Sequence, residues 1–153
     1  MTLIAAFTHK NYGTAFVGDM LLSTEKSEQT ADLLLPARID SKRPVEARHI
    51  CGMAQKVIII SNTFVVAWAG SYLTAKSILN AMQAYLPHPN STNEVFHFID
   101  SYGLSEKELE NIGLAFSILT IGKDGDFAFQ TAIHNGNLLE ASEKLNIRFA
   151  GSG

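Results

Sequence analysis

The sequence predicts an α+β domain in which helices are layered on antiparallel sheet. The chain has 153 residues, with a hydrophobic fraction of 46% and a charged fraction of 18%, which is typical of one folded domain with a substantial core. Short apolar runs joined by brief turns occur in both halves of the chain, and helical spacing lies between them. We therefore expect a single domain over residues 1–153, ordered as strands, helices and strands.

The N-terminal part predicts a hairpin. Residues 2–8 form an apolar run, the stretch His9-Lys10-Asn11-Tyr12-Gly13 has turn chemistry, and residues 14–22 predict the second strand. Residues 23–53 are polar and mixed in charge, and prolines interrupt them. Within them Leu33-Leu34-Leu35 is either a short strand or a patch that docks on a neighbouring molecule.

The middle of the chain predicts two strands followed by helices. Residues 56–60 are rich in β-branched side chains, and residues 64–69 form the next apolar run, which Gly70 ends. Apolar residues recur at helical spacing from Tyr72 to Leu86. A second helix is expected over residues 93–102, with Thr92 as its N-cap, and Ser105 with Glu108 matches a capping box that starts a third.

The C-terminal part returns to strands. Residues 114–121 and 127–133 flank the turn Lys123-Asp124-Gly125 and predict a hairpin. A last strand is expected at residues 146–150, before Gly151-Ser152-Gly153.

Composition excludes several classes of function. The formal net charge is −3 and the Lys and Arg residues are scattered, which argues against nucleic acid or anionic lipid as a partner. The first residues do not have the pattern of a signal peptide, and no apolar run is long enough to span a membrane. The single cysteine, Cys51, precludes an intrachain disulfide and favours a reducing, cytoplasmic location. It is interpreted as a packed or surface thiol.

Cofactor and metal sites are not expected. The five histidines have no paired ligand spacing. No glycine-rich loop matches a nucleotide-binding fingerprint.

Thr2 carries the most specific chemistry in the sequence. Removal of Met1 would make this threonine the N-terminal residue. Its hydroxyl would then be a nucleophile with a general base in the same residue. The base is the α-amine, whose unperturbed pKa of about 7.7–8.0 lets it accept a proton near neutral pH.

Charged and small residues elsewhere could support a nucleophile. Asp19 and Lys56 lie in apolar runs, where each charge is costly unless it is paired. A pair beside Thr2 would lower the pKa of its amine and hydroxyl through the lysine charge; alternatively, both side chains face solvent. The stretch Ala69-Gly70-Ser71 separates a strand from a helix and could present backbone N–H groups to an oxyanion, or it is a plain turn.

Taken in order, these residues resemble the proteasome β-subunit family. The features are Thr2 at the first strand, Gly18-Asp19 in the second, Gln55-Lys56-Val57, Ala69-Gly70-Ser71 and Gly151-Ser152-Gly153. The family includes the bacterial ATP-dependent protease of the same fold. The resemblance implies a four-layer α-β-β-α sandwich of the N-terminal nucleophile (Ntn) hydrolase type.

The resemblance also implies roles and partners. Thr2 would be the nucleophile of a threonine-type endopeptidase, Lys56 and Asp19 the pair that tunes it, Gly70 an oxyanion donor and Ser152 a supporting hydroxyl near the amine. The substrate would be a peptide or a small amide. The chain would form a homo-oligomeric ring, with an ATP-dependent unfoldase as a further partner.

The sequence departs from the family pattern in three places. Residues 23–53 look like an insertion. Either Met1 or Thr2 can occupy the nucleophile's position, and with Met1 there the chain would be a non-catalytic subunit that serves assembly or gating. Family members continue past Gly-Ser-Gly, so the C-terminal part of the family fold is absent from this chain, which is either a fragment or lacks one helical layer and part of the site.

Besides the peptidase and the non-catalytic subunit, a third alternative is an Ntn hydrolase of a small non-peptide amide.

Overall fold

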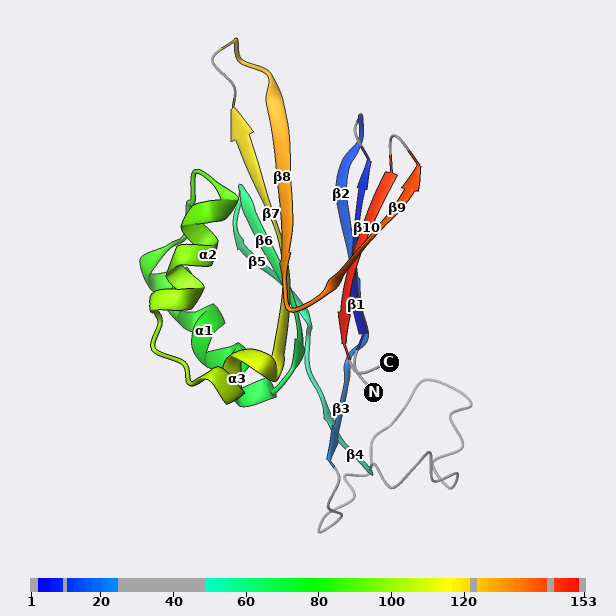
Figure 1. Ribbon diagram of the computed structural model, residues 1–153, viewed down its shortest axis with the longest axis vertical. Helices are drawn as coiled ribbons and strands as arrows, with labels where there is room; N and C mark the ends of the chain where they lie inside the picture. Colours follow the sequence, from blue (N-terminus) through cyan, green and yellow to red (C-terminus); the bar gives the residue numbers. More distant parts are fainter. Residues whose placement is uncertain (1–2, 10, 25–48, 122–123, 143–144, 152–153) are drawn as a thin grey trace.

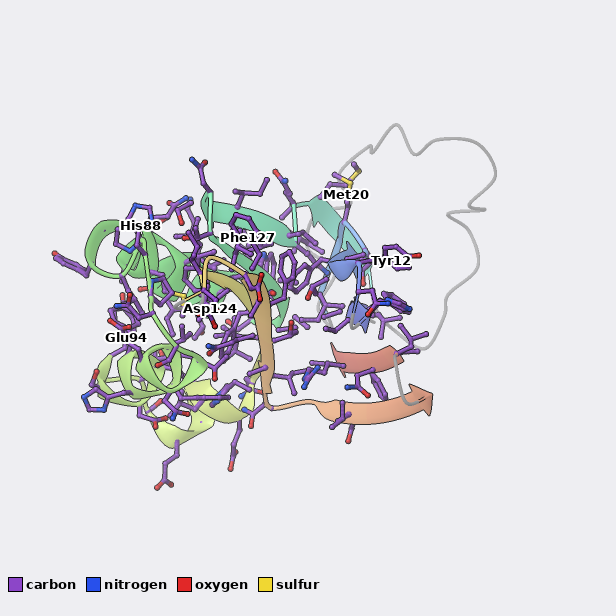
Figure 2. The ribbon with its side chains drawn as sticks, turned by 90° about the horizontal axis from the view of Figure 1, so that it is seen from above. Tyr12, Met20, His88, Glu94, Asp124 and Phe127 are labelled. Carbon is purple, nitrogen blue, oxygen red and sulfur yellow. The ribbon has the colours of Figure 1, made fainter. Side chains whose placement is uncertain are left out.

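Two antiparallel sheets face each other, and three helices cover the outer face of one of them (Figure 1). The computed structural model describes residues 3–9, 11–24, 49–121, 124–142 and 145–151. Seen from above, His88 and Glu94 lie on the helical side of the molecule, and Tyr12 and Met20 lie on the opposite side (Figure 2). The described chain therefore has three layers, in the order helices, sheet, sheet.

The first sheet has the strand order β2-β1-β10-β9 and the second has the order β5-β6-β7-β8. A separate two-stranded ribbon, β3–β4, extends beyond the end of the sheets (Figure 1). The strands are β1 (Leu3–His9), β2 (Gly13–Gly18), β3 (Leu21–Thr24), β4 (His49–Met53), β5 (Val57–Ser61), β6 (Phe64–Gly70), β7 (Ile112–Ile121), β8 (Phe127–His134), β9 (Asn137–Ser142) and β10 (Leu145–Gly151). The helices are α1 (Tyr72–Tyr85), α2 (Thr92–Ser101) and α3 (Glu106–Glu110).

Large apolar side chains fill the space between the helices and the second sheet. Alternate residues of β6 and β7 point to this side because strand side chains alternate between faces. Phe64 and Phe116 are fully buried, and Trp68 is nearly so. They meet the buried stripe of α1, including Ile78 and Met82. This layer is the larger of the two cores.

Small side chains separate the two sheets. Ala6, Ala67, Ala115 and Ala150 belong to the cluster in this space, and all are buried. A Cβ atom placed on Gly113 would lie 2.6 Å from the Cβ of Ala150. The sheets can therefore approach closely only because these positions lack bulk.

The expected four-layer sandwich is wrong. All three described helices lie on one side of the β5-β6-β7-β8 sheet, and no described helix covers the outer face of the β2-β1-β10-β9 sheet. The reason is visible in the pattern: helical spacing occurs only between Tyr72 and Glu110, and every described element after Ile112 is a strand.

Several expected boundaries also change. The strand expected over residues 14–22 is two strands, β2 and β3, because the chain leaves the first sheet at Asp19 and Met20. Strand β4 falls in the stretch taken for an insertion, and β9 was not predicted. The N-cap of α2 is Ser91 rather than Thr92. Residues 25–48, including Leu33–Leu35, lie outside the described residues.

Two local predictions are confirmed. The side chains of Ser105 and Glu108 form the expected capping box at α3. Strands β7 and β8 pair as an antiparallel hairpin, with Leu114 opposite His134 and Ile121 opposite Phe127.

His134 is a partly buried ionisable group at the end of β8. Its Nε2 atom is buried and has no hydrogen-bond partner among the described residues. Loss of hydration on burial lowers the pKa of His134 below its ordinary value, against opposing effects of Asp100 and of a hydrogen bond with the backbone of Leu109. The neutral imidazole is therefore the form that the fold accommodates.

We expect stability to fall as this histidine is forced to take a proton. Because the folded-state pKa is lowered, the stabilisation is present above the unfolded pKa of about 6.5 and is lost as the pH falls below it. The His134→Gln variant should lose less stability than the wild type between about pH 7.5 and about pH 5.5. Urea unfolding midpoints at the two pH values measure this. An exposed histidine variant, His97→Gln, is the control, and equal pH dependence in all three proteins would contradict the prediction.

Candidate functional site

A buried lysine–aspartate pair is the main feature of the candidate site. Lys56 Nζ lies 2.6 Å from Asp19 Oδ1, and the lysine side chain is fully buried while that of Asp19 is 31% exposed. The ammonium also lies 5.4 Å from the centre of the Trp68 ring, within cation–π range. The pair is thus shielded on the lysine side and open on the aspartate side.

The second oxygen of Asp19 holds the start of β1. Leu3 N donates a hydrogen bond to Asp19 Oδ2 at 2.6 Å, and Asp19 N donates to Leu3 O at 3.1 Å. One carboxylate therefore bridges the Lys56 ammonium and the backbone amide of Leu3. The peptide bond that contains this amide joins Leu3 to Thr2.

The local backbone explains why these residues meet. Strand β2 ends at Gly18, and a Cβ atom on this glycine would lie 3.2 Å from the Cβ of Lys56. The absence of a side chain at Gly18 thus leaves room for the lysine. On the other side, Trp68 N donates to Lys56 O at 2.9 Å and fixes the lysine backbone against β6.

Gly70 lies at the junction between β6 and α1. Its φ is +96°, and a Cβ atom there would lie 2.0 Å from Asn111 O. Only glycine fits this position, because the conformation is left-handed and the neighbouring backbone is too close. Ser71 follows as the N-cap of α1 and accepts a hydrogen bond from Thr74 N.

A cavity of about 350 Å³ adjoins the pair. It lies between α1 and the strands β5 and β6, and its lining includes Trp68, whose ring the Lys56 ammonium approaches. Its lining combines apolar and polar side chains, among them Ala54, Ile58, Trp68, Tyr72, Lys76 and Gln83. The volume is that of a small-molecule or side-chain pocket.

The structure brings some of the site residues expected from the sequence together, and others lie outside the described residues. Asp19 and Lys56 are brought together, and the alternative that both face solvent is wrong for Lys56. Gly70 lies on the strand next to β5, two residues after Trp68. Thr2 and Ser152 lie outside the described residues, so their expected roles stay predictions.

Trp68 is the site residue that sequence reasoning missed. Its indole Nε1 donates to Gln55 O at 3.0 Å, and its ring contacts the lysine and the cavity. The signal that could have found it is a tryptophan two residues before a strand-ending glycine, on the face opposite the alanines.

Metal ligation is not evident in the described part of the chain. No three His, Cys, Asp or Glu side chains there gather closely enough to hold an ion. None of the described helices has the length and apolar character that crossing a bilayer requires. Comparison of the chain with models of known protein families and with curated proteins yields no match.

We expect the two halves of the pair to differ in their effect on stability. Asp19→Ala removes the carboxylate from a fully buried ammonium, and loss of one partner of a buried pair destabilises a protein by about 3–5 kcal/mol. Lys56→Met instead leaves a carboxylate that is partly exposed and can be hydrated. We expect its loss of unfolding free energy to be less than half of that of Asp19→Ala.

Urea unfolding of the two variants and of the double variant measures this difference. The double variant should be more stable than Asp19→Ala alone, because it no longer buries the charge. Equal losses in the two single variants would show that the ammonium does not depend on this carboxylate.

Proposed function

We propose that this chain is a threonine-type amide hydrolase related to the proteasome β-subunits, with Thr2 as its nucleophile after removal of Met1. The observation that carries the proposal is the Asp19 carboxylate, which bridges the buried Lys56 ammonium and the Leu3 amide. This arrangement fixes a positive charge close to the first described residue of β1. Such a charge lowers the pKa of a nearby hydroxyl and amine.

The proposed reaction divides amide cleavage into two steps. The α-amine of Thr2 takes the hydroxyl proton as the oxygen attacks the substrate carbonyl carbon. The tetrahedral intermediate then collapses, the carbon–nitrogen bond breaks and the leaving amine takes the proton from the ammonium. Water, activated by the same amine, hydrolyses the resulting ester and restores the threonine.

The other residues would support this chemistry. Lys56 stabilises the alkoxide that develops on Thr2, and Asp19 holds the lysine in place. A backbone N–H at Gly70 would stabilise the oxyanion, a contribution of about 2.7–4 kcal/mol in known hydrolases. Ser152 would hydrogen-bond the amine.

The cavity beside Trp68 supports a substrate with a sizeable side group. Ile58 and Trp68 offer apolar surface, whereas Lys76 offers a positive charge. A peptide side chain, or a substituent of similar size on a small amide, would occupy it. We further propose a cytoplasmic location, because the single cysteine favours a reducing compartment. A homo-oligomeric ring and an ATP-dependent unfoldase as partner are proposed on the resemblance alone.

The test is labelling of the purified protein with a β-lactone or an epoxyketone, read by mass spectrometry. We expect an N-terminus at Thr2 and one adduct on that residue. Thr2→Ala should lose amide hydrolysis by at least about 1,000-fold and Thr2→Ser should retain much of it, because the serine keeps the hydroxyl and the amine.

Lys107→Gln is the control variant, because it removes an exposed charge on α3, away from the cavity, and leaves the Lys56–Asp19 pair intact. It should still form the adduct on Thr2. Retained Met1 in the native protein, or hydrolysis unaffected by Thr2→Ala, would overturn the proposal. In the first case a non-catalytic subunit becomes the better account.

A further inference from the structure

An arginine faces the space between the two sheets. On β10, Ala150 pairs with Ile4 and Arg148 pairs with Ala6. Ile4, Ala6 and Ala150 all belong to the buried cluster between the sheets. Because strand residues two apart share a face, Arg148 points to the same side. The other residues of the buried cluster between the sheets are alanines and an isoleucine.

Arg148 has no partner for its charge in the described structure. Its side chain is half-buried, and it makes no hydrogen bond or ion pair with any described residue. Burial lowers the pKa of its guanidinium below the ordinary value. A desolvated guanidinium offers five N–H donors in a planar fork that matches a carboxylate.

Hydroxyl groups gather on the same inner face. The Oγ1 atoms of Thr14 and Thr131 are 2.8 Å apart, Thr131 donates to Ser117 Oγ at 3.1 Å, and Ser117 donates to Thr14 Oγ1 at 3.3 Å. These three hydroxyls close a ring across the two sheets. Thr8 Oγ1 lies 3.4 Å from Thr14 Oγ1, at the limit of a hydrogen bond. Its proton can therefore turn to another acceptor with little loss.

Register places the arginine within reach of these hydroxyls. Thr8 pairs with Asn146, which is two residues from Arg148 on β10. Diagonal neighbours of this kind have their side chains about 7–8 Å apart, within the reach of an arginine. The half-buried Asn146 adds an amide on the same face. A small anion at this point could contact Arg148, Asn146 and Thr8 together.

Apolar side chains border the same space. Phe129 pairs with Leu119 and lies on the face of β8 that carries Thr131. Its ring closely approaches Gly13, where an added Cβ atom would lie 2.7 Å from Cε2 of the ring. Phe129 is 48% exposed. Leu138, opposite Arg148 on β9, is 51% exposed. An exposed aliphatic group opposite a guanidinium favours an anion with an apolar substituent over an inorganic ion.

We propose that Arg148, Asn146 and Thr8 form a binding site for a carboxylate with a short apolar chain. This site is separate from the Lys56–Asp19 pair. Leu3, which Asp19 holds, and Thr8 are five residues apart on β1, or about 16 Å along an extended strand. The inference does not depend on Thr2 being a nucleophile.

The register also places an acidic residue close to the arginine in the sheet. Glu140 on β9 pairs with Asn146, next to the pair formed by Leu138 and Arg148. The Glu140→Gln variant therefore tests whether the arginine binds a ligand or an acidic residue of its own chain.

The test is calorimetric titration of the full chain with hexanoate, with hexanol and sulfate as matched probes. We expect hexanoate to bind with a Kd of the order of 1 mM and to bind at least about 10-fold more tightly than either probe. Arg148→Gln should weaken hexanoate binding by about 10-fold or more, since charge-assisted hydrogen bonds are lost. Arg148→Lys should weaken it less, and Thr8→Val by a few-fold.

Controls separate this site from general charge and from catalysis. Lys107→Gln, which removes an exposed cation on α3, should leave hexanoate binding unchanged, as should Thr2→Ala. Circular dichroism and the thermal midpoint establish that Arg148→Gln folds. Equal binding of hexanol or sulfate would overturn the proposal, as would binding that Arg148→Gln does not change. Binding seen only in Glu140→Gln would overturn it too, because Glu140 would then be the arginine's partner.

Discussion

The burial of the Lys56 ammonium constrains the arrangement of strands around it. A charge removed from water must be compensated by partners with good geometry. Among the described contacts, Asp19 supplies compensation and the Trp68 ring adds a weaker part. These residues belong to different elements, so the beginning of β5, the end of β2 and the middle of β6 must meet at one point. The bridge from Asp19 to Leu3 then fixes the first residues of β1 to the same point.

The two hydrophobic cores stabilise the place where Asp19, Lys56 and Trp68 meet in different ways. Bulky side chains between the helices and the second sheet supply most of the apolar burial. Alanines and glycines between the sheets instead allow the two sheets to pack closely, and this close packing restricts their relative movement. The ring of hydroxyls formed by Thr14, Ser117 and Thr131 continues this inner layer in polar form. The inner layer thus changes from apolar to polar along the strands.

Sequence patterns predicted the local elements better than the layers. The apolar runs of β1, β6 and β7, the stripe of α1 and the capping box of α3 carry their own signals, because each depends on residues close in sequence. Strands β4 and β9 lack strong apolar alternation, so sequence alone did not reveal them, although β9 pairs with the neighbouring strand β10. Asp19 and Lys56 could be suspected because charges stood in apolar runs, but their contact depends on the packing of two sheets. The fourth layer came from family resemblance alone, and resemblance in a few motifs does not determine the number of layers.

The ribbon formed by β3 and β4 connects the buried pair to the cavity. Leu21 pairs with Met53 and Thr24 pairs with His49, so the chain that follows Asp19 and the chain that precedes Lys56 are held side by side. Met53 also lines the cavity, and Ala54 N donates to Met20 O at 2.8 Å. A change in the pairing of β3 and β4 would therefore alter the geometry of the pair and the shape of the cavity together.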